Sequence, residues 1–150
     1  MIMELIAAAI GTVAFSLLFG VPKKYYLSCA FIGFAGWLMY RCMLALSLGT
    51  TLAVFIATLL IVFLSRVSAV RRQCPATVFL ITGIFPLVPG AQIYWAAYYL
   101  VTNQFSLAQS SGLSALKVMI AIVLGIIFVF EIPHRFFFFF KRKSASENQG

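Results

Sequence analysis

Acidic residues are scarce in this sequence, and none of the three lies in the middle of an apolar segment. Glu4 and Glu131 lie at the ends of apolar segments, and Glu147 lies in the C-terminal tail. Proton- and sodium-coupled transporters commonly use carboxylates within the membrane. If this chain takes part in transport against a gradient, we therefore expect a partner to supply the coupling group.

Histidine and cysteine are also scarce, which argues against catalysis and metal binding. The single histidine, His134 beside Arg135, has no partner set for a nucleophile and no metal-ligand spacing. Cys29, Cys42 and Cys74 fit no disulfide or metal framework and are interpreted as small buried hydrophobic residues. We expect neither enzymatic activity nor a cofactor nor a metal site.

Charged residues make up only 9% of the chain, against about 25% in soluble domains. Hydrophobic residues make up 63%, and the mean hydropathy is +1.07. A soluble fold of this length could not bury so much apolar surface, so the composition predicts an integral membrane protein. Glu4 stands where a cleavable signal peptide would carry a basic residue, so the first segment is expected to remain as a helix.

Five apolar segments predict an all-α membrane protein with about five transmembrane helices, four being the alternative. The expected spans are residues 4–21, 25–46, 50–64, 77–101 and 116–132, with a polar loop over 102–114. The count of five depends on whether the short segment 50–64 is a full span. Residues 1–143 are expected to form a single transmembrane domain, and 144–150 a disordered cytoplasmic tail.

The basic residues, which give a net charge of +8, predict the orientation in the membrane. Placing the N-terminus outside and the C-terminus inside puts nine of the eleven on the cytoplasmic side: Lys23, Lys24, Arg66, Arg71, Arg72, Arg135, Lys141, Arg142 and Lys143. The positive-inside rule favours this arrangement. Because these residues cluster in short loops between apolar segments, we interpret them as topology determinants and contacts with anionic lipids of the bilayer, and expect no nucleic-acid partner.

Small residues four apart on two segments predict surfaces for close helix packing. Ala53 and Ala57 form such a pair in the third segment, and Ala121 and Gly125 form another in the fifth. We expect these two faces to contact a partner subunit.

The fourth apolar segment is interrupted near its centre by Gly83-Ile-Phe-Pro-Leu-Val-Pro-Gly90. Pro86 and Pro89 lack an N–H, and their rings clash with the carbonyl groups four residues earlier. Glycine allows backbone angles that other residues avoid. Such a break within a membrane persists only where it is buried in protein or faces a water-filled cavity. It is either a functional discontinuity or only a packing kink.

A half-helix that begins near Pro89 offers free N–H groups and the positive end of its dipole to a carboxylate. Transporters often bind solutes at such broken helices. The candidate residues of the solute path lie at or near the break: Thr82, Pro86, Pro89, Gly90, Ala91, Gln92 and Tyr94. Arg41 joins this set as the most deeply embedded charge, and it either snorkels outward or meets an anionic solute or a partner's carboxylate.

Several stretches together resemble a known family. They are Ala14-Phe-Ser-Leu-Leu-Phe-Gly-Val-Pro22, Cys29-Ala-Phe-Ile-Gly-Phe-Ala-Gly36, Pro75-Ala-Thr-Val-Phe, and the 83–90 stretch followed by Tyr94. Over about residues 8–130 the chain resembles the C-terminal membrane half of the threonine/serine exporter (ThrE) family. This half also occurs as a separate small subunit of the YjjB type.

The resemblance implies export of threonine, serine or another small carboxylate such as succinate across the cytoplasmic (inner) membrane. It also implies a second membrane subunit of the YjjP type, and hence a possible homo- or hetero-oligomer. The competing hypothesis is a membrane assembly or scaffold subunit that transports nothing and whose proline break only shapes packing.

Overall fold

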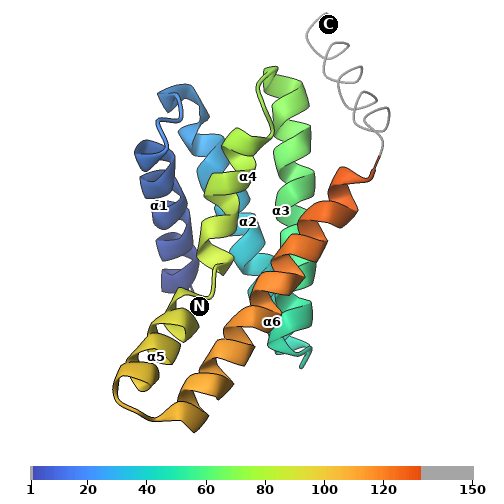
Figure 1. The fold of residues 1–150 in the computed structure, drawn as a ribbon. Helices are drawn as coiled ribbons and strands as arrows, with labels where there is room; N and C mark the ends of the chain where they lie inside the picture. The colour runs from blue at the N-terminus through green and yellow to red at the C-terminus, as the bar shows by residue number, and fades with distance from the viewer. Residues whose placement is uncertain (1, 133–150) are drawn as a thin grey trace, which may run out of the picture.

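A computed structural model describes residues 2–132, and every regular element in this part of the chain is helical (Figure 1). The α-helices are α1 (Ile2–Leu18), α2 (Tyr26–Ala45), α3 (Thr50–Arg72), α4 (Thr77–Ile84), α5 (Gly90–Val101) and α6 (Phe105–Phe130). Two short 3-10 helices, η1 (Lys23–Tyr25) and η2 (Phe85–Leu87), precede α2 and follow α4. The predicted all-α class is confirmed.

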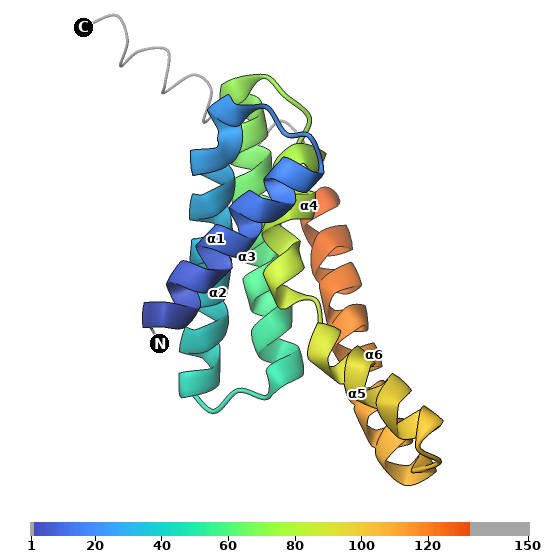
Figure 2. The same cartoon turned by 90° about the vertical axis from the view of Figure 1, so that its left-hand side faces the viewer.

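The helices run alternately up and down, with α4 and α5 forming one broken descending segment (Figure 1). α3 lies at the centre, packed against α2, α4 and α6, while α1 packs on α2. The interior of this bundle is filled by Cys29, Ile32, Ala57, Ile61 and Phe79, each at most 1% exposed. α5 packs mainly on α6, and this hairpin leans away from the bundle (Figure 2).

Glycines allow the close approach of α2 to its neighbours. A Cβ added at Gly33 would lie 1.9 Å from Oγ1 of Thr12 on α1, and one at Gly36 would lie 2.4 Å from Cδ1 of Ile61 on α3. Thr12 is fully buried, and its hydroxyl donates to the Ala8 carbonyl at 2.7 Å. The α1–α2 contact therefore depends on the absence of a side chain at Gly33.

We expect Gly33→Ala to destabilise the protein by about 1–3 kcal/mol, because overpacking forces the helices or Thr12 to move. The measurement is thermal unfolding in detergent. Gly11→Ala on α1 is the matched control, since an added Cβ there has no atom within 4 Å. Adding Thr12→Ala should recover only part of the loss, because the Cβ of residue 12 would still lie 2.8 Å from the added Cβ. Equal melting temperatures for Gly33→Ala and Gly11→Ala would contradict this packing.

By length and composition, three helical segments could cross a membrane: Lys23–Ala45, Thr50–Arg72 and Phe105–Phe130. The bent pair Thr77–Leu87 and Gly90–Val101 makes up to four if it counts as one span. α1 is a shorter apolar helix. The segment around 50–64 is thus one of the candidate spans, and a fifth span would have to be α1. The orientation in the membrane stays a prediction.

The segment whose length was in question extends past residue 64 and is long enough to be a full span. α3 continues to Arg72, and Arg66 lies inside it, only 3% exposed, instead of in a polar loop. Its guanidinium donates to the carbonyls of Val129 and, at 2.9 Å, Ile132. It also lies 5.3 Å from the Phe130 ring. The C-terminal end of α6 thus supplies hydrogen-bond acceptors for the buried guanidinium, because the last carbonyls of a helix lack partners within the helix.

The expected polar loop over 102–114 was also wrong, because α6 already begins at Phe105. The turn needs only residues 102–104, where Asn103 adopts a positive φ of 58° and the Gln104 N–H donates to the Tyr99 carbonyl at 2.8 Å. The serines that suggested a loop lie on the helix surface. Ser114, for example, donates to the Ser110 carbonyl at 2.9 Å, which satisfies a hydroxyl without leaving the helix.

The small-residue faces pack within the chain rather than toward a partner. Ala53 and Ala57 are fully buried, and Ala121 is 4% exposed. A Cβ added at Gly125 would lie 2.9 Å from Cγ2 of Thr58, so α6 meets α3 through these faces. The expectation that they contact a partner subunit was therefore wrong.

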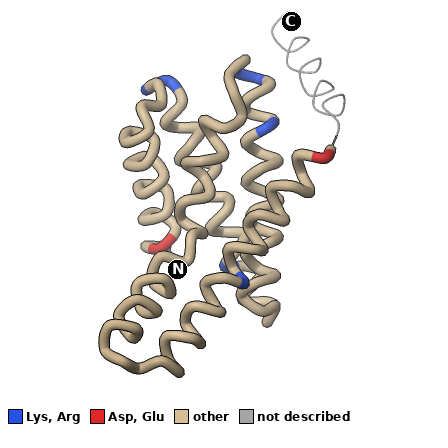
Figure 3. Tube along the Cα trace, viewed as in Figure 1, with Lys and Arg blue, Asp and Glu red and all other residues tan. Residues whose placement is uncertain are grey.

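Most of the described basic residues gather at one end of the structure, and a smaller group lies toward the opposite end (Figure 3). Lys23 and Lys24 lie in the α1–α2 connection, and Arg71 and Arg72 end α3 at the same end of the bundle. This distribution agrees with the charge count behind the predicted orientation. His134, Arg135, Lys141–Lys143, Glu147 and the expected tail 144–150 lie outside the described residues.

Candidate functional site

The predicted break is the sharpest departure from helix in the fourth segment. α4 ends at Ile84, the 3-10 turn η2 contains Pro86, and Val88 is extended with φ −62° and ψ 129°. α5 then starts at Gly90 at an angle of 54° to the preceding helix (Figure 1). The two prolines thus separate two half-helices with different directions.

Hydrogen bonds at the break show which amides remain available. The Gly90 N–H donates to the Val88 carbonyl at 2.8 Å across a tight turn at Pro89, and the Ile93 N–H donates to the Pro89 carbonyl at 3.1 Å. The first turn of a helix leaves its other N–H groups without intrahelical partners. Ala91 and Gln92 therefore hold the available amides, whereas the Gly90 N–H is used within the turn.

Gly90 itself is not required by the backbone. Among the described glycines, Gly20 is the one with a positive φ, so Gly90 does not use the angles that exclude other residues. A Cβ added at Gly90 would also have no atom within 4 Å. The two prolines, rather than the glycine, account for the conformation of the break.

A cavity of about 300 Å³ lies beside the break. It is lined by residues from four helices, α2, α3, α5 and α6, and from the break itself: Trp37, Tyr40, Thr50, Val54, Pro86, Leu87, Val88, Pro89, Gly90, Ala91, Gln92, Trp95 and Val118. Its volume is at the lower end of the roughly 300–1,000 Å³ typical of small-molecule sites. The break therefore borders a space large enough for a small solute.

Two helices begin at this cavity. α5 starts at Gly90, and α3 starts at Thr50, both of which line it. The N-terminus of a helix carries a partial positive charge and favours anions. No acidic or basic side chain is among the lining residues, so the two helix ends are the positive groups that the lining itself supplies.

Trp37 provides a further donor. Its indole Nε1 is buried and has no hydrogen-bond partner in the described part of the chain. Trp37 and Pro86 also line a second cavity of about 290 Å³, which Glu4, Ala7 and other residues of α1 complete. Trp37 and Pro86 thus lie between two adjoining spaces, one on each side of the broken segment.

Three predicted residues do not join the cavity lining. Thr82 is fully buried within α4, and its hydroxyl lies 3.2 Å from the carbonyls of both Val78 and Phe79. Tyr94 is 63% exposed on α5. Arg41 neither lines a described cavity nor is isolated, because its Nε lies 3.3 Å from Oε2 of Glu4. The sequence had suggested snorkelling, an anionic solute or a partner's carboxylate for Arg41, but not an acid of the same chain.

Several lining residues were not predicted from the sequence. Trp37 and Tyr40 of α2 lie with their ring centroids 5.2 Å apart, and Thr50 and Val54 come from α3. They are 30 or more positions away from the break in the sequence. Only the packing of α2 and α3 against the broken segment identifies them.

These features define a class: a multi-pass helical membrane protein with a broken helix beside a small cavity. The chain belongs to the threonine/serine exporter family, since the family described as "Threonine/Serine exporter, ThrE" matches residues 4–132. An uncharacterized protein of Haemophilus influenzae is 31% identical over 98 residues, covering 65% of this chain and 33% of that protein. The chain thus spans about a third of the length of this curated relative. No solved structure matches it.

Proposed function

We propose that this chain is the YjjB-type membrane subunit of a secondary transporter of the inner membrane. In this proposal it exports a small carboxylate-bearing solute, such as threonine, serine or succinate, together with a second membrane subunit of the YjjP type. Family membership supports the class of transporter. The cavity beside the break supports the solute class, because two helix N-termini begin at it.

In the proposed site, the solute carboxylate accepts hydrogen bonds from the amides of Ala91 and Gln92. The Nε1 of Trp37 is a third donor from the facing helix, and its lack of a partner among the described residues supports this role. A buried donor without an acceptor costs free energy, which a bound carboxylate would recover. Arg41, paired with Glu4, acts on the packing of α1 and α2 rather than on the solute.

Trp37→Phe tests this arrangement because it keeps an aromatic ring and removes the N–H. We expect the variant to fold normally and to weaken apparent affinity for the exported solute by roughly tenfold, the value of one hydrogen bond to a charged group. The measurement is efflux of labelled threonine, serine and succinate from cells that also express the second subunit.

Tyr26→Phe on the same helix is the matched control for Trp37→Phe, since it removes one polar group from a half-buried ring outside the cavity lining. It should leave efflux unchanged. Wild-type affinity in Trp37→Phe would rule out the indole donor. Absence of efflux of every carboxylate tested, with both subunits present and folded, would instead favour an assembly or scaffold role.

A further inference from the structure

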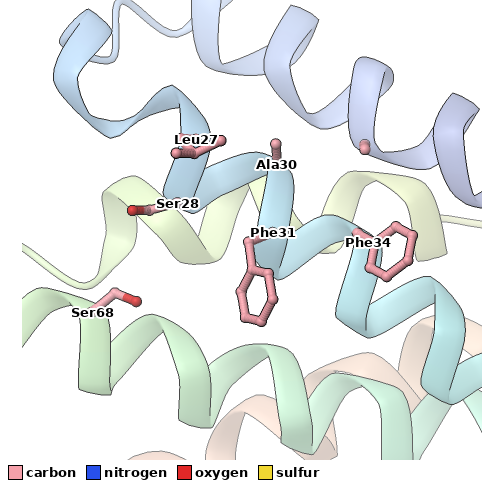
Figure 4. A pocket seen from close by; sticks show the side chains of 7 residues that line it. Leu27, Ser28, Ala30, Phe31, Phe34 and Ser68 are labelled. Atoms are coloured by element: carbon pink, nitrogen blue, oxygen red, sulfur yellow. The ribbon is translucent and has the colours of Figure 1, made fainter.

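A groove apart from the two cavities at the break lies along α2, near the basic end of the bundle. Its volume is about 550 Å³, and it opens between α1, α2 and α3 (Figure 4). Its walls are mainly apolar and include Leu27, Phe31 and Phe34 of α2. Leu27 is 82% exposed and Phe31 62% exposed, so both present apolar surface to the surroundings of the helix.

Two serine hydroxyls project into this groove. Ser28 on α2 and Ser68 on α3 point into the gap between the helices (Figure 4). Ser28 and Ser68 are half-buried. The fully buried hydroxyls of Thr12, Ser16 and Thr58 each donate to a carbonyl four residues earlier, whereas that of Ser65 has no partner among the described residues. Ser28 and Ser68 make no hydrogen bond with the described residues. Because an unsatisfied hydroxyl is unfavourable in an apolar environment, these two indicate a polar ligand.

Three cations lie about one turn beyond the hydroxyls. Arg71 and Arg72 follow Ser68 by three and four residues, and residues so spaced share a helix face. Arg72 donates to the Lys24 carbonyl at 3.3 Å, which holds the end of α3 against the start of α2. The side chains of Lys24, Arg71 and Arg72 are exposed and form no ion pair with the described residues.

From these observations we infer that the groove binds one anionic phospholipid. The apolar walls contact an acyl chain, the hydroxyls of Ser28 and Ser68 donate to the ester or phosphate oxygens, and the three cations bind the headgroup. This order of apolar, hydroxyl and cationic groups matches the order of groups along a phospholipid. Basic pockets between transmembrane helices bind anionic headgroups in the same way. The inference is independent of the proposed transport site.

The test measures lipid binding to the purified full chain by native mass spectrometry, with dioleoyl phosphatidylglycerol and dioleoyl phosphatidylcholine as probes. We expect preference for phosphatidylglycerol. Arg71→Gln with Arg72→Gln should weaken its binding by roughly tenfold or more, since each basic residue near the headgroups contributes about a factor of five. Lys117→Gln, which removes a charge far from the groove, should have no effect.

A second variant separates a built site from general attraction to a basic surface. Ser68→Phe should fill the groove and weaken phosphatidylglycerol binding to a similar extent, while Ala97→Phe on the exposed surface of α5 should not. If Ser68→Phe does not fold, Ser28→Ala with Ser68→Ala replaces it and should also weaken binding. Equal binding of the two lipids, or loss on charge removal with full binding in the groove variants, would overturn the inference.

Discussion

Replacing Pro86 and Pro89 together by alanine should give a folded, membrane-inserted protein whose export activity is reduced at least about tenfold, or ~1.4 kcal/mol in the barrier. Alanine restores the missing N–H groups and removes the ring clashes, so α4 and α5 can join into one helix. Helix propensity favours this by roughly 3 kcal/mol for each proline removed. Loss of the 54° bend would move the start of α5 and eliminate the Ala91 and Gln92 amides as donors.

The double-alanine variant needs a control for the loss of proline itself. Pro75→Ala serves, because Pro75 precedes α4 in an exposed turn and lines none of the cavities described at the break. It should export at the rate of the unmodified chain. Both variants are compared for expression, thermal unfolding and efflux of labelled solute. Unchanged export by a well-folded double-alanine variant would show that the break is only a kink.

The break was predictable because its cause is local. Two prolines three residues apart kink or break a helix when they stand in its interior, and the structure departs from α-helix between Ile84 and Gly90. The all-α class was predictable for a similar reason, since composition alone excludes a soluble fold. The detail at Gly90 was not predictable, because whether its N–H is free depends on the turn that Pro89 adopts.

The features that the sequence did not reveal depend on contacts between distant segments. Arg66 looked like a loop residue because a charge usually ends a hydrophobic run, yet the end of α6, more than 60 residues away, supplies its acceptors. The same holds for Arg41, whose acid partner Glu4 lies at the start of another helix. A hydropathy pattern describes one segment at a time, so it cannot show which polar groups meet.

The Ala121–Gly125 pair shows that residue spacing predicts close helix packing without identifying the helix that is contacted. Its spacing correctly indicated close helix packing, and Gly125 does approach Thr58 closely. The spacing does not identify the partner helix, which proved to be α3 of the same chain. A surface for the second subunit must therefore be sought elsewhere. α5 is the strongest candidate, because none of its residues Gly90–Val101 is buried within the described chain.

This chain reconstituted alone in liposomes should show no accumulation of threonine, serine or succinate against a gradient, and addition of the second membrane subunit should produce it. Both acids among the described residues lie at helix ends, Glu4 near the start of α1 and Glu131 just after α6 (Figure 3). No carboxylate lines the 300 Å³ cavity. Coupling to a proton or sodium ion within the membrane therefore requires a group that the described helices do not supply at the site.

Among the described residues, Glu4 is the one acid that lines either of the two cavities at the break, so its substitution tests whether this chain supplies the coupling group. In the complex of both subunits, Glu4→Gln should retain uphill transport. It breaks the half-exposed ion pair with Arg41, and such pairs contribute only about 0–1 kcal/mol to stability. Uphill transport by the single chain, abolished by Glu4→Gln, would assign coupling to Glu4 and remove the need for a partner. Transport that appears only with the second subunit and survives Glu4→Gln would place the coupling group on that subunit, because its helices must then bring a carboxylate to the cavity beside the break.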